Sequence, residues 1–416
     1  MHGDAAGREA IESLIRDRTG TVVDDDDTVD LSGYRGHRIL RFNTGAERCE
    51  HRPGGWKIRF HRAPRLASFA DANLRQGRAT MTSEPGRGAI VLAAYSPDPE
   101  LFRIQLRSLQ DQSVRDWECI ISVDGERDAV ESLVAGVVAG DERFRVVGDD
   151  ARRGFYRNFE YGLRAVPANA AWIALCDQDD RWEPSKIADL LPHLKEVSLI
   201  SGQARLVRYP SGEVTGVTDR VDHGAVLTLL SNQFTGSLCV FDREILATAL
   251  PFPHVSSRVA THDHWLAVVA GAYRGTRIVD EVVQDYVQHD ANVFGDPSRL
   301  ESAGLAASVR NVLSLAERYE GSRSPLALMR MTFWTYVGWR QVMVDTLRSR
   351  KGLPDQRIEA AFGVERRWPA LNALLRRAAR SGVVPARFVL EYRASWLAGL
   401  LSGGRHAARD AAHRSP

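Results

Sequence analysis

The feature that most constrains the fold is a regular alternation of short apolar runs and amphipathic stretches that begins at Gly88. Apolar runs at 89–95, 117–124, 144–148 and 170–176 have the length of buried strands. The stretches between them carry apolar residues three and four positions apart, which is typical of helices packed on one face. Strands that alternate with helices of this size predict βαβ units and a mostly parallel sheet.

Three parts of the chain differ in pattern. Residues 1–87 are predicted to form an accessory segment, in which "HRILRF" and "WKIRF" flank a turn-rich "HRPGG" and are compatible with a β-hairpin. Residues 88–296 form the predicted α/β domain. Residues 297–416 are dominated by helical patterns and form a predicted carboxyl-terminal helical region.

Three carboxylates, Asp177, Asp179 and Asp180, follow directly after an apolar run in "WIALCDQDDRWEPSKI". In parallel sheets, ligands gather at the carboxyl ends of strands, where this cluster is expected to lie. Residues two apart in extended chain project to the same side, so Asp177 and Asp179 can converge while Asp180 points elsewhere or caps the helix near Pro184. Oxygen ligands of this kind suit Mg²⁺ or Mn²⁺. Taken alone, the cluster is equally compatible with a solvated loop.

Composition excludes several classes of protein. The formal net charge is only +2, which argues against a surface built for nucleic acid. No apolar run reaches the roughly 18 residues of a membrane span. The amino-terminal stretch lacks the layout of a signal peptide, and the four cysteines contain no CxxC pair. A cytoplasmic protein with reduced thiols is expected.

Seven blocks follow one another in the α/β segment: "AYSPDPELFRIQLRSLQDQS", "WECIISVDGERD", "GFYRNFEYGL", "WIALCDQDDRWEPSKI", "NQFTGSLCVFDREIL", "THDHWLAVVAGAYRGTRIV" and "QDYVQHDANVFG". In order and spacing they resemble the family 2 glycosyltransferases, which have the GT-A fold, over about residues 88–296. The later blocks are similar to the rhamnosyltransferase-like branch of that family.

The resemblance implies which residues bind the sugar-nucleotide donor. Ala94 and Tyr95 would line the nucleotide base, and Asp124 would accept a hydrogen bond from its ring N–H. Trp182 and Lys186 match the "DDxWxxxK" layout and would form scaffold or donor-pocket wall. Two departures put details of base recognition in doubt: the usual paired acids appear as Val-Asp, and the family's "TYN"-like opening is Ala-Tyr-Ser.

The resemblance also implies the metal ligands and the catalytic base. Asp179 would be the main ligand of Mg²⁺ or Mn²⁺, and Asp177 would approach the metal or the ribose. His289 would lie near the metal or the diphosphate, although a structural histidine fits the sequence equally well. Asp263, in "THDHW", matches the acid that serves as catalytic base. The neighbouring His262 and His264 are unsuited to one metal ion, because residues two apart on a helix point about 200° apart.

The implied activity is inverting, metal-dependent transfer of a sugar, with rhamnose as the first candidate, from a nucleotide-diphosphate sugar. The acceptor would be a polysaccharide, a glycolipid or another glycan. A dinucleotide oxidoreductase is disfavoured because "AAYSPDP" lacks a GxGxxG motif, and a nucleotidyltransferase would need a Gly-rich loop and a Lys there. A non-catalytic sugar-nucleotide-binding module that retains the GT-A fold remains the alternative.

The end of the chain is strongly basic. Residues 366–416 contain ten arginines, no lysine, and only Glu391 and Asp410 as acids. Two interpretations stay open. These helices could lie on an anionic membrane face near a lipid-linked acceptor, or they could be the solvated faces of a helical domain or a homo-oligomer contact.

Overall fold

The computed structural model of the chain describes residues 86–253, 255, 260–289, 305–353 and 355–413, together with three short strands nearer the amino terminus. The chain separates into two compact units, Met1–Thr82 and Ser83–Pro416. In the first unit β3 pairs antiparallel with both β1 and β2. These strands are β1 (Thr28–Asp30), β2 (Arg48–Arg52) and β3 (Gly55–Arg59). The segment "HRILRF", expected as a hairpin strand, lies outside the described residues.

The second unit is built on a nine-stranded mixed sheet with the order β6-β5-β4-β7-β11-β9-β12-β8, and β10 pairs with β9. The strands are β4 (Gly88–Ala94), β5 (Trp117–Asp124), β6 (Phe144–Asp149), β7 (Trp172–Cys176), β8 (Arg181–Trp182), β9 (Leu199–Arg208), β10 (Glu213–Val217), β11 (Cys239–Asp242) and β12 (Thr276–Gln288). Strands β4 to β7 are parallel, whereas β11 runs antiparallel to both β7 and β9. The predicted α/β fold class is confirmed.

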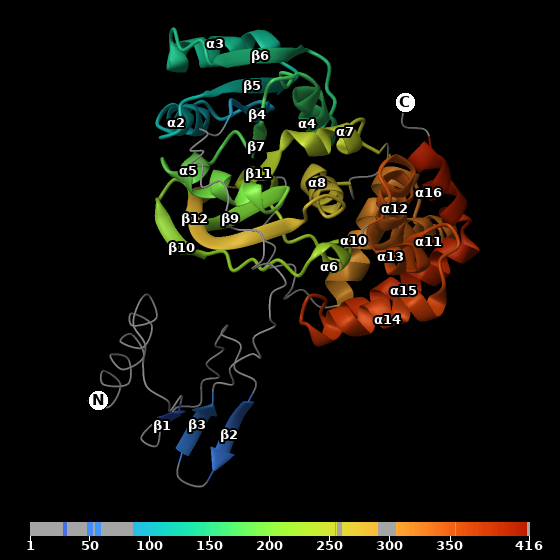
Figure 1. Cartoon of the computed structure of the whole chain (residues 1–416). Coiled ribbons are helices and arrows are strands. Elements are labelled where there is room, and N and C mark those ends of the chain that lie inside the picture. The colour runs from blue at the N-terminus through green and yellow to red at the C-terminus, as the bar shows by residue number, and fades with distance from the viewer. Residues whose placement is uncertain are drawn as a thin grey trace, which may run out of the picture. The chain divides into compact units, whose positions relative to one another are not determined.

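Helices cover both faces of this sheet (Figure 1). Alternation along β4 sends successive side chains to opposite faces. Ile90 belongs to the core beneath α2 and α3, whereas Val91 belongs to the core beneath α4 and α8. The helices of this part are α2 (Pro99–Gln110), α3 (Arg127–Val138), α4 (Phe155–Arg164), α5 (Lys186–Leu190), α6 (Ala225–Thr228), α7 (Leu246–Ala249) and α8 (His262–Ala270), with short 3₁₀ turns η2 (Leu191–Lys195), η3 (Gly236–Leu238) and η4 (Arg243–Ile245).

The carboxyl-terminal helices continue the core on the α4 and α8 side (Figure 1). The ring of Tyr156 in α4 meets Trp339 edge-on at 6.1 Å between ring centroids. Arg350 donates hydrogen bonds to the carbonyls of Thr248 at 2.9 Å and Pro251 at 2.6 Å. None of the helices that the structure describes is long and apolar enough to cross a bilayer. The carboxyl-terminal helices are α10 (Leu305–Glu320), α11 (Pro325–Phe333), the π-helical η5 (Trp334–Gly338), α12 (Trp339–Arg350), α13 (Gln356–Phe362), α14 (Trp368–Arg380), α15 (Ala386–Leu401) and α16 (Gly404–His413).

Helix α4 lies directly against the sheet because Gly162 has no side chain. A Cβ at this position would lie 2.6 Å from Cγ1 of Val91 and 3.0 Å from Cβ of Ser122. Helix α3 offers a matched position, Gly136, also two residues before the helix end, where a Cβ would meet nothing within 4 Å. Substitution of the two glycines by alanine therefore distinguishes the effect of helix propensity on stability from the effect of packing against the sheet.

We expect Gly162→Ala to lower the free energy of unfolding by about 1–3 kcal/mol, because the added methyl group overpacks the contact with the sheet. Gly136→Ala should raise it by about 0.5–1 kcal/mol, since alanine favours the helix and no clash opposes it. Thermal unfolding of both variants measures the difference. Equal shifts in the two variants would contradict a close contact at Gly162.

Candidate active site

The loop after β7 is tied to the end of β4 by the side chain of Gln178. The Tyr95 backbone N–H donates to Oε1 of Gln178 at 2.7 Å, and Nε2 of Gln178 donates to the Tyr95 carbonyl at 3.0 Å. The amide thus imitates one more backbone pairing between neighbouring parallel strands. The acidic cluster is fixed at the carboxyl edge of the sheet.

Asp180 turns into the protein interior and is 1% exposed. Its Oδ1 accepts a hydrogen bond from the Val287 backbone N–H at 3.1 Å, and Oδ2 accepts one from Nε2 of Gln284 at 2.8 Å. The expected alternative, a cap on the following helix, is not what this side chain does, because α5 begins after Ser185. Asp180 therefore anchors the carboxyl half of β12.

A buried network continues from Gln284 to Lys186. The Lys186 ammonium donates to Oε1 of Gln284 at 2.7 Å and to the Ser237 carbonyl, and it lies 3.6 Å from the centroid of the Trp182 ring. Gln284 also donates to Oγ of Ser237 at 3.0 Å. Burial lowers the pKa of Lys186 to about 7 and raises the pKa of Asp180 well above its ordinary value. Trp182 and Lys186 thus lie beneath the loop rather than on an open wall.

Asp179 and His289 meet at the surface above this network. Oδ2 of Asp179 lies 2.9 Å from Nε2 of His289, although the two residues are 110 positions apart in the chain. Both side chains keep some exposure, 23% for Asp179 and 16% for His289. Asp180 holds Val287 two residues before His289, so the network beneath positions the pair above.

Asp177 and Asp263 add acidic groups to the same region. Burial, the charge of Asp179 and the charge of Asp263 together raise the pKa of Asp177 to about 7, opposed by a hydrogen bond with Ser237. Asp263 lies in the first turn of α8, where its Oδ1 accepts from the His264 backbone N–H at 2.6 Å. The negative charge of Asp263 is thus one contribution to the raised pKa of Asp177.

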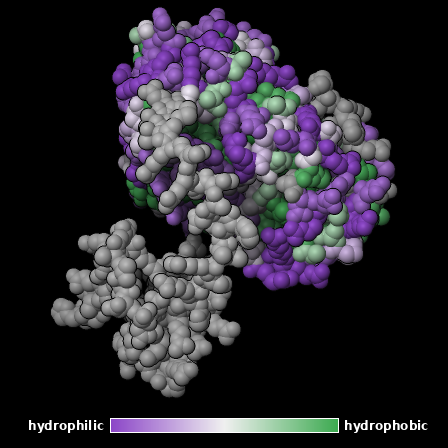
Figure 2. Space-filling model, in the orientation of Figure 1, coloured by the Kyte–Doolittle hydropathy of each residue, from purple (hydrophilic) through white to green (hydrophobic). Residues whose placement is uncertain are grey.

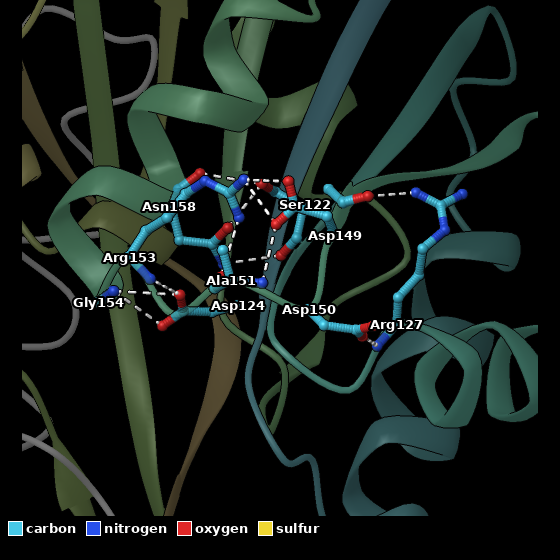
Figure 3. Close-up of polar contacts among 10 residues, drawn as sticks. Ser122, Asp124, Arg127, Asp149, Asp150, Ala151, Arg153, Gly154 and Asn158 are labelled. Carbon is cyan, nitrogen blue, oxygen red and sulfur yellow. Dashed lines mark hydrogen bonds and ion pairs between the residues drawn. The ribbon is translucent and has the colours of Figure 1, made fainter.

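Asp124, at the end of β5, is 2% exposed and binds the start of α4 (Figure 3). Its two carboxylate oxygens accept from the Gly154 backbone N–H at 3.1 and 3.0 Å, and Oδ1 also accepts from the N–H of Arg153. A carboxylate has about four acceptor positions, and these contacts use three of them.

Ala94 and Tyr95 differ in access. Ala94 is fully buried in the sheet, whereas the Tyr95 side chain is 43% exposed. The guanidinium of Arg152 lies 3.8 Å from the centroid of the Tyr95 ring. Tyr95 and Arg152 together present a flat, cationic surface beside the carboxyl end of β4.

The two histidines that flank Asp263 are structural. His262 stacks on Phe159 with 3.8 Å between ring centroids, and Nε2 of His264 lies 2.8 Å from the Thr228 carbonyl. Burial lowers the pKa of His262 to about 4 and that of His264 to about 3. The two rings serve different contacts, in agreement with the helical spacing argument.

Residues that organise the site without standing out in the sequence are Gln178, Ser237 and Gln284. Each lies inside one of the conspicuous sequence blocks, but nothing in the one-dimensional pattern marks a glutamine or serine as buried. The available signal is a polar residue placed within an apolar block. Within the described residues, no group of three or more His, Cys, Asp or Glu is arranged to hold a metal ion.

Comparison with known proteins gives one family match. Residues 90–245 match the model of the family described as glycosyl transferase family 2. An uncharacterized protein of Sinorhizobium fredii (strain NBRC 101917 / NGR234), y4gI, is 30% identical over 100 residues, which cover 24% of this chain and 11% of that protein. The chain therefore matches about a tenth of the length of that relative.

Two solved structures contain chains with some similarity to this one. S. aureus TarS 1–349 in complex with UDP-GlcNAc has a TM-score of 0.42 and 13% identity, covering 78% of this chain and 89% of that chain. The mannosyltransferase PcManGT from Pyrobaculum calidifontis, in complex with GDP-Man and Mn²⁺, has a TM-score of 0.39 and 18% identity, covering 77% and 88%.

The buried network predicts the effect of replacing Gln284. Gln284→Met keeps the side-chain length but removes one of the two acceptors of the Lys186 ammonium and the hydrogen-bond donor to Oδ2 of Asp180. We expect the free energy of unfolding to fall by about 3 kcal/mol. Gln288→Met, on the same strand but only partly buried, should change it by less than about 0.5 kcal/mol. If chemical unfolding showed equal losses of free energy in the two variants, the buried network would not be the source of the stabilisation.

Proposed function

We propose that this chain is a glycosyltransferase that moves a sugar from a nucleotide-diphosphate sugar to a hydroxyl group of an acceptor. The observation that carries the proposal is the contact of Asp179 with His289 beside Asp177. This contact joins the end of β12 to a loop of the segment that matches glycosyl transferase family 2.

A divalent cation, Mg²⁺ or Mn²⁺, is proposed to bind at the Asp179–His289 contact, although the described residues bring no third such group into ligating position. Asp179 and His289 would hold it, with Asp177 as a further oxygen ligand or as a partner of the ribose. Such ions are commonly bound by one or two protein carboxylates and otherwise by water and substrate phosphates, so a small protein set is sufficient. When bound, the ion neutralises the charge that develops on the leaving diphosphate.

Asp263 is proposed as the catalytic base. Its carboxylate is partly exposed at the first turn of α8, and its charge contributes to the raised pKa of Asp177. A carboxylate there can take the proton of the acceptor hydroxyl as that oxygen attacks the anomeric carbon. With a single base and direct displacement, the product has the inverted configuration and no glycosyl-enzyme intermediate forms.

Donor recognition is assigned to the edge formed by β4 and β5. Tyr95, with Ala94 beneath it, would face the nucleotide base, and the carboxylate of Asp124 would meet a ring N–H. Trp182 and Lys186 would act from below by holding the loop. Rhamnose is the first candidate sugar because the later sequence blocks resemble the rhamnosyltransferase-like branch. The acceptor is proposed to be a polysaccharide, a glycolipid or another glycan.

The alternative of a non-catalytic sugar-nucleotide-binding module makes a different prediction. A binding module would bind a donor without releasing its nucleoside diphosphate, whereas the transferase releases it. The direct test is a screen of UDP-, GDP- and dTDP-sugars with Mg²⁺ or Mn²⁺, following both donor binding and nucleoside diphosphate release. Absence of binding and of release with every donor would overturn the proposal.

Asp179→Asn should remove metal-dependent donor binding, because a neutral amide replaces the main anionic ligand. Calorimetric titration of the donor with and without Mn²⁺ measures this loss. Asp189→Asn, an acid of the nearby α5 that contacts Ser185, serves as the control and should bind the donor as the unmodified chain does. Retained metal-dependent binding in Asp179→Asn would refute its assignment as ligand.

Asp263→Asn should leave donor binding intact while slowing transfer by a factor of roughly 10² or more, because the acceptor hydroxyl loses its base. Parallel titration of the donor and assay of glycosylated product separate the two effects. Full transfer activity in this variant would show that another group removes the proton.

A further inference from the structure

Helices α14 and α15 form an antiparallel pair. The Trp368 and Trp396 rings lie 5.1 Å apart between centroids, and Nε of Arg393 donates to Oδ1 of Asn372 at 2.8 Å. The residue numbers of the contacts increase along α14, from 368 to 372, while they decrease along α15, from 396 to 393. The two helices are therefore antiparallel. This hairpin carries five arginines, no lysine and one acidic residue, Glu391.

The outer side of α15 is apolar although it is exposed. Leu390 is 60% exposed, Leu397 49% and Leu401 76%, and Ala394 is also exposed. These four residues, spaced by four, three and four positions, form one continuous apolar stripe along the helix. The inner side of α15 is apolar as well, with Tyr392 and Ala398 buried. A continuous apolar stripe on a helix normally packs against another surface.

Arginines lie beside the apolar stripe. The exposed positions of α14 include a row with the same spacing of four, three and four: Pro369, Ala373, Arg376 and Arg380. Arg377 is exposed next to them. None of these three arginines forms an ion pair with another residue that the structure describes. Figure 2 shows hydrophobic and hydrophilic residues intermingled over the carboxyl-terminal helices.

The exposed rows of the two helices face the same side of the pair. On α14 the positions 369 and 373 each follow a residue that contacts α15, and on α15 the positions 394 and 397 each follow a residue that contacts α14. One residue corresponds to a turn of about 100° in a right-handed helix. In an antiparallel pair that rotation carries both rows to the same side. The leucines and arginines therefore form one surface.

We propose that this α14–α15 surface docks the protein on an anionic lipid bilayer. A row of leucines enters the acyl boundary, and flanking arginines meet lipid phosphates, which is how interfacial helices bind. Charge complementarity favours lipid as the occupant: neither acid of residues 366–416 lies on either row, and the carboxylate oxygens of Glu391 are buried. This inference does not depend on the proposed sugar transfer.

The test is co-sedimentation of the full chain with vesicles of phosphatidylcholine alone and of phosphatidylcholine mixed with phosphatidylglycerol. We expect binding to the mixed vesicles at least roughly tenfold stronger than to the neutral ones, and weaker at high salt. The variant L390Q/L397Q/L401Q should lose binding to both vesicles. The variant R376Q/R380Q should weaken binding to the anionic vesicles by roughly tenfold or more.

Matched controls are L326Q, an exposed leucine of α11, and R107Q, an exposed arginine of α2. Both should bind vesicles as the unmodified chain does, and circular dichroism should show every variant folded. Failure of the unmodified chain to bind anionic vesicles would overturn the proposal. So would equal loss in the controls, or a leucine variant that changes only the oligomeric state in light scattering. Donor binding, measured without vesicles, reports separately on the proposed function.

Discussion

The candidate site depends on one buried interaction, in which a neutral amide side chain links a lysine to an aspartate by hydrogen bonds. Gln284 accepts from Lys186 and donates to Asp180, so both ionisable groups are satisfied without touching each other. An unpartnered buried charge costs far more free energy than an unpartnered amide. These hydrogen bonds between Lys186, Gln284 and Asp180 therefore fix three segments of the protein at once. Only one arrangement of these segments satisfies the hydrogen bonds of all three side chains. The segments are the loop after β7, the first residue of α5 and the end of β12.

The candidate base is held by a different set of contacts, because α8 is positioned from the other face of the sheet. Nε1 of Trp265 donates to the Ala249 carbonyl at 2.9 Å, and His264 contacts the Thr228 carbonyl. The core that encloses α8 continues into the carboxyl-terminal helices, which include Trp339 and Phe362. The proposed metal ligands and the proposed base are thus held in place by the two different cores of the sheet.

The strand and helix alternation predicted the α/β fold well, because buried strands and amphipathic helices leave strong periodic signals. The place of the acidic cluster at a strand end followed from the same pattern. The inward turn of Asp180 and the burial of Lys186 could not be predicted, because a lysine after a tryptophan normally remains solvated. The antiparallel β11 was equally hidden, since its four residues carry no sign of direction. The local sequence pattern indicates which residues are buried and whether a segment is a helix or a strand. It does not determine which distant residues pair with them.

The distance along the chain between Asp179 and His289 has a consequence for synthesis. A chain emerging from the ribosome carries the acidic loop well before it carries the histidine, with 110 positions between them. Domains generally fold as units as they emerge, and contacts this distant form late. A nascent chain that ends before β12 therefore holds the acids without the imidazole or the Gln284 link. The Asp179–His289 pair exists only in a chain that already contains β12, because His289 follows that strand.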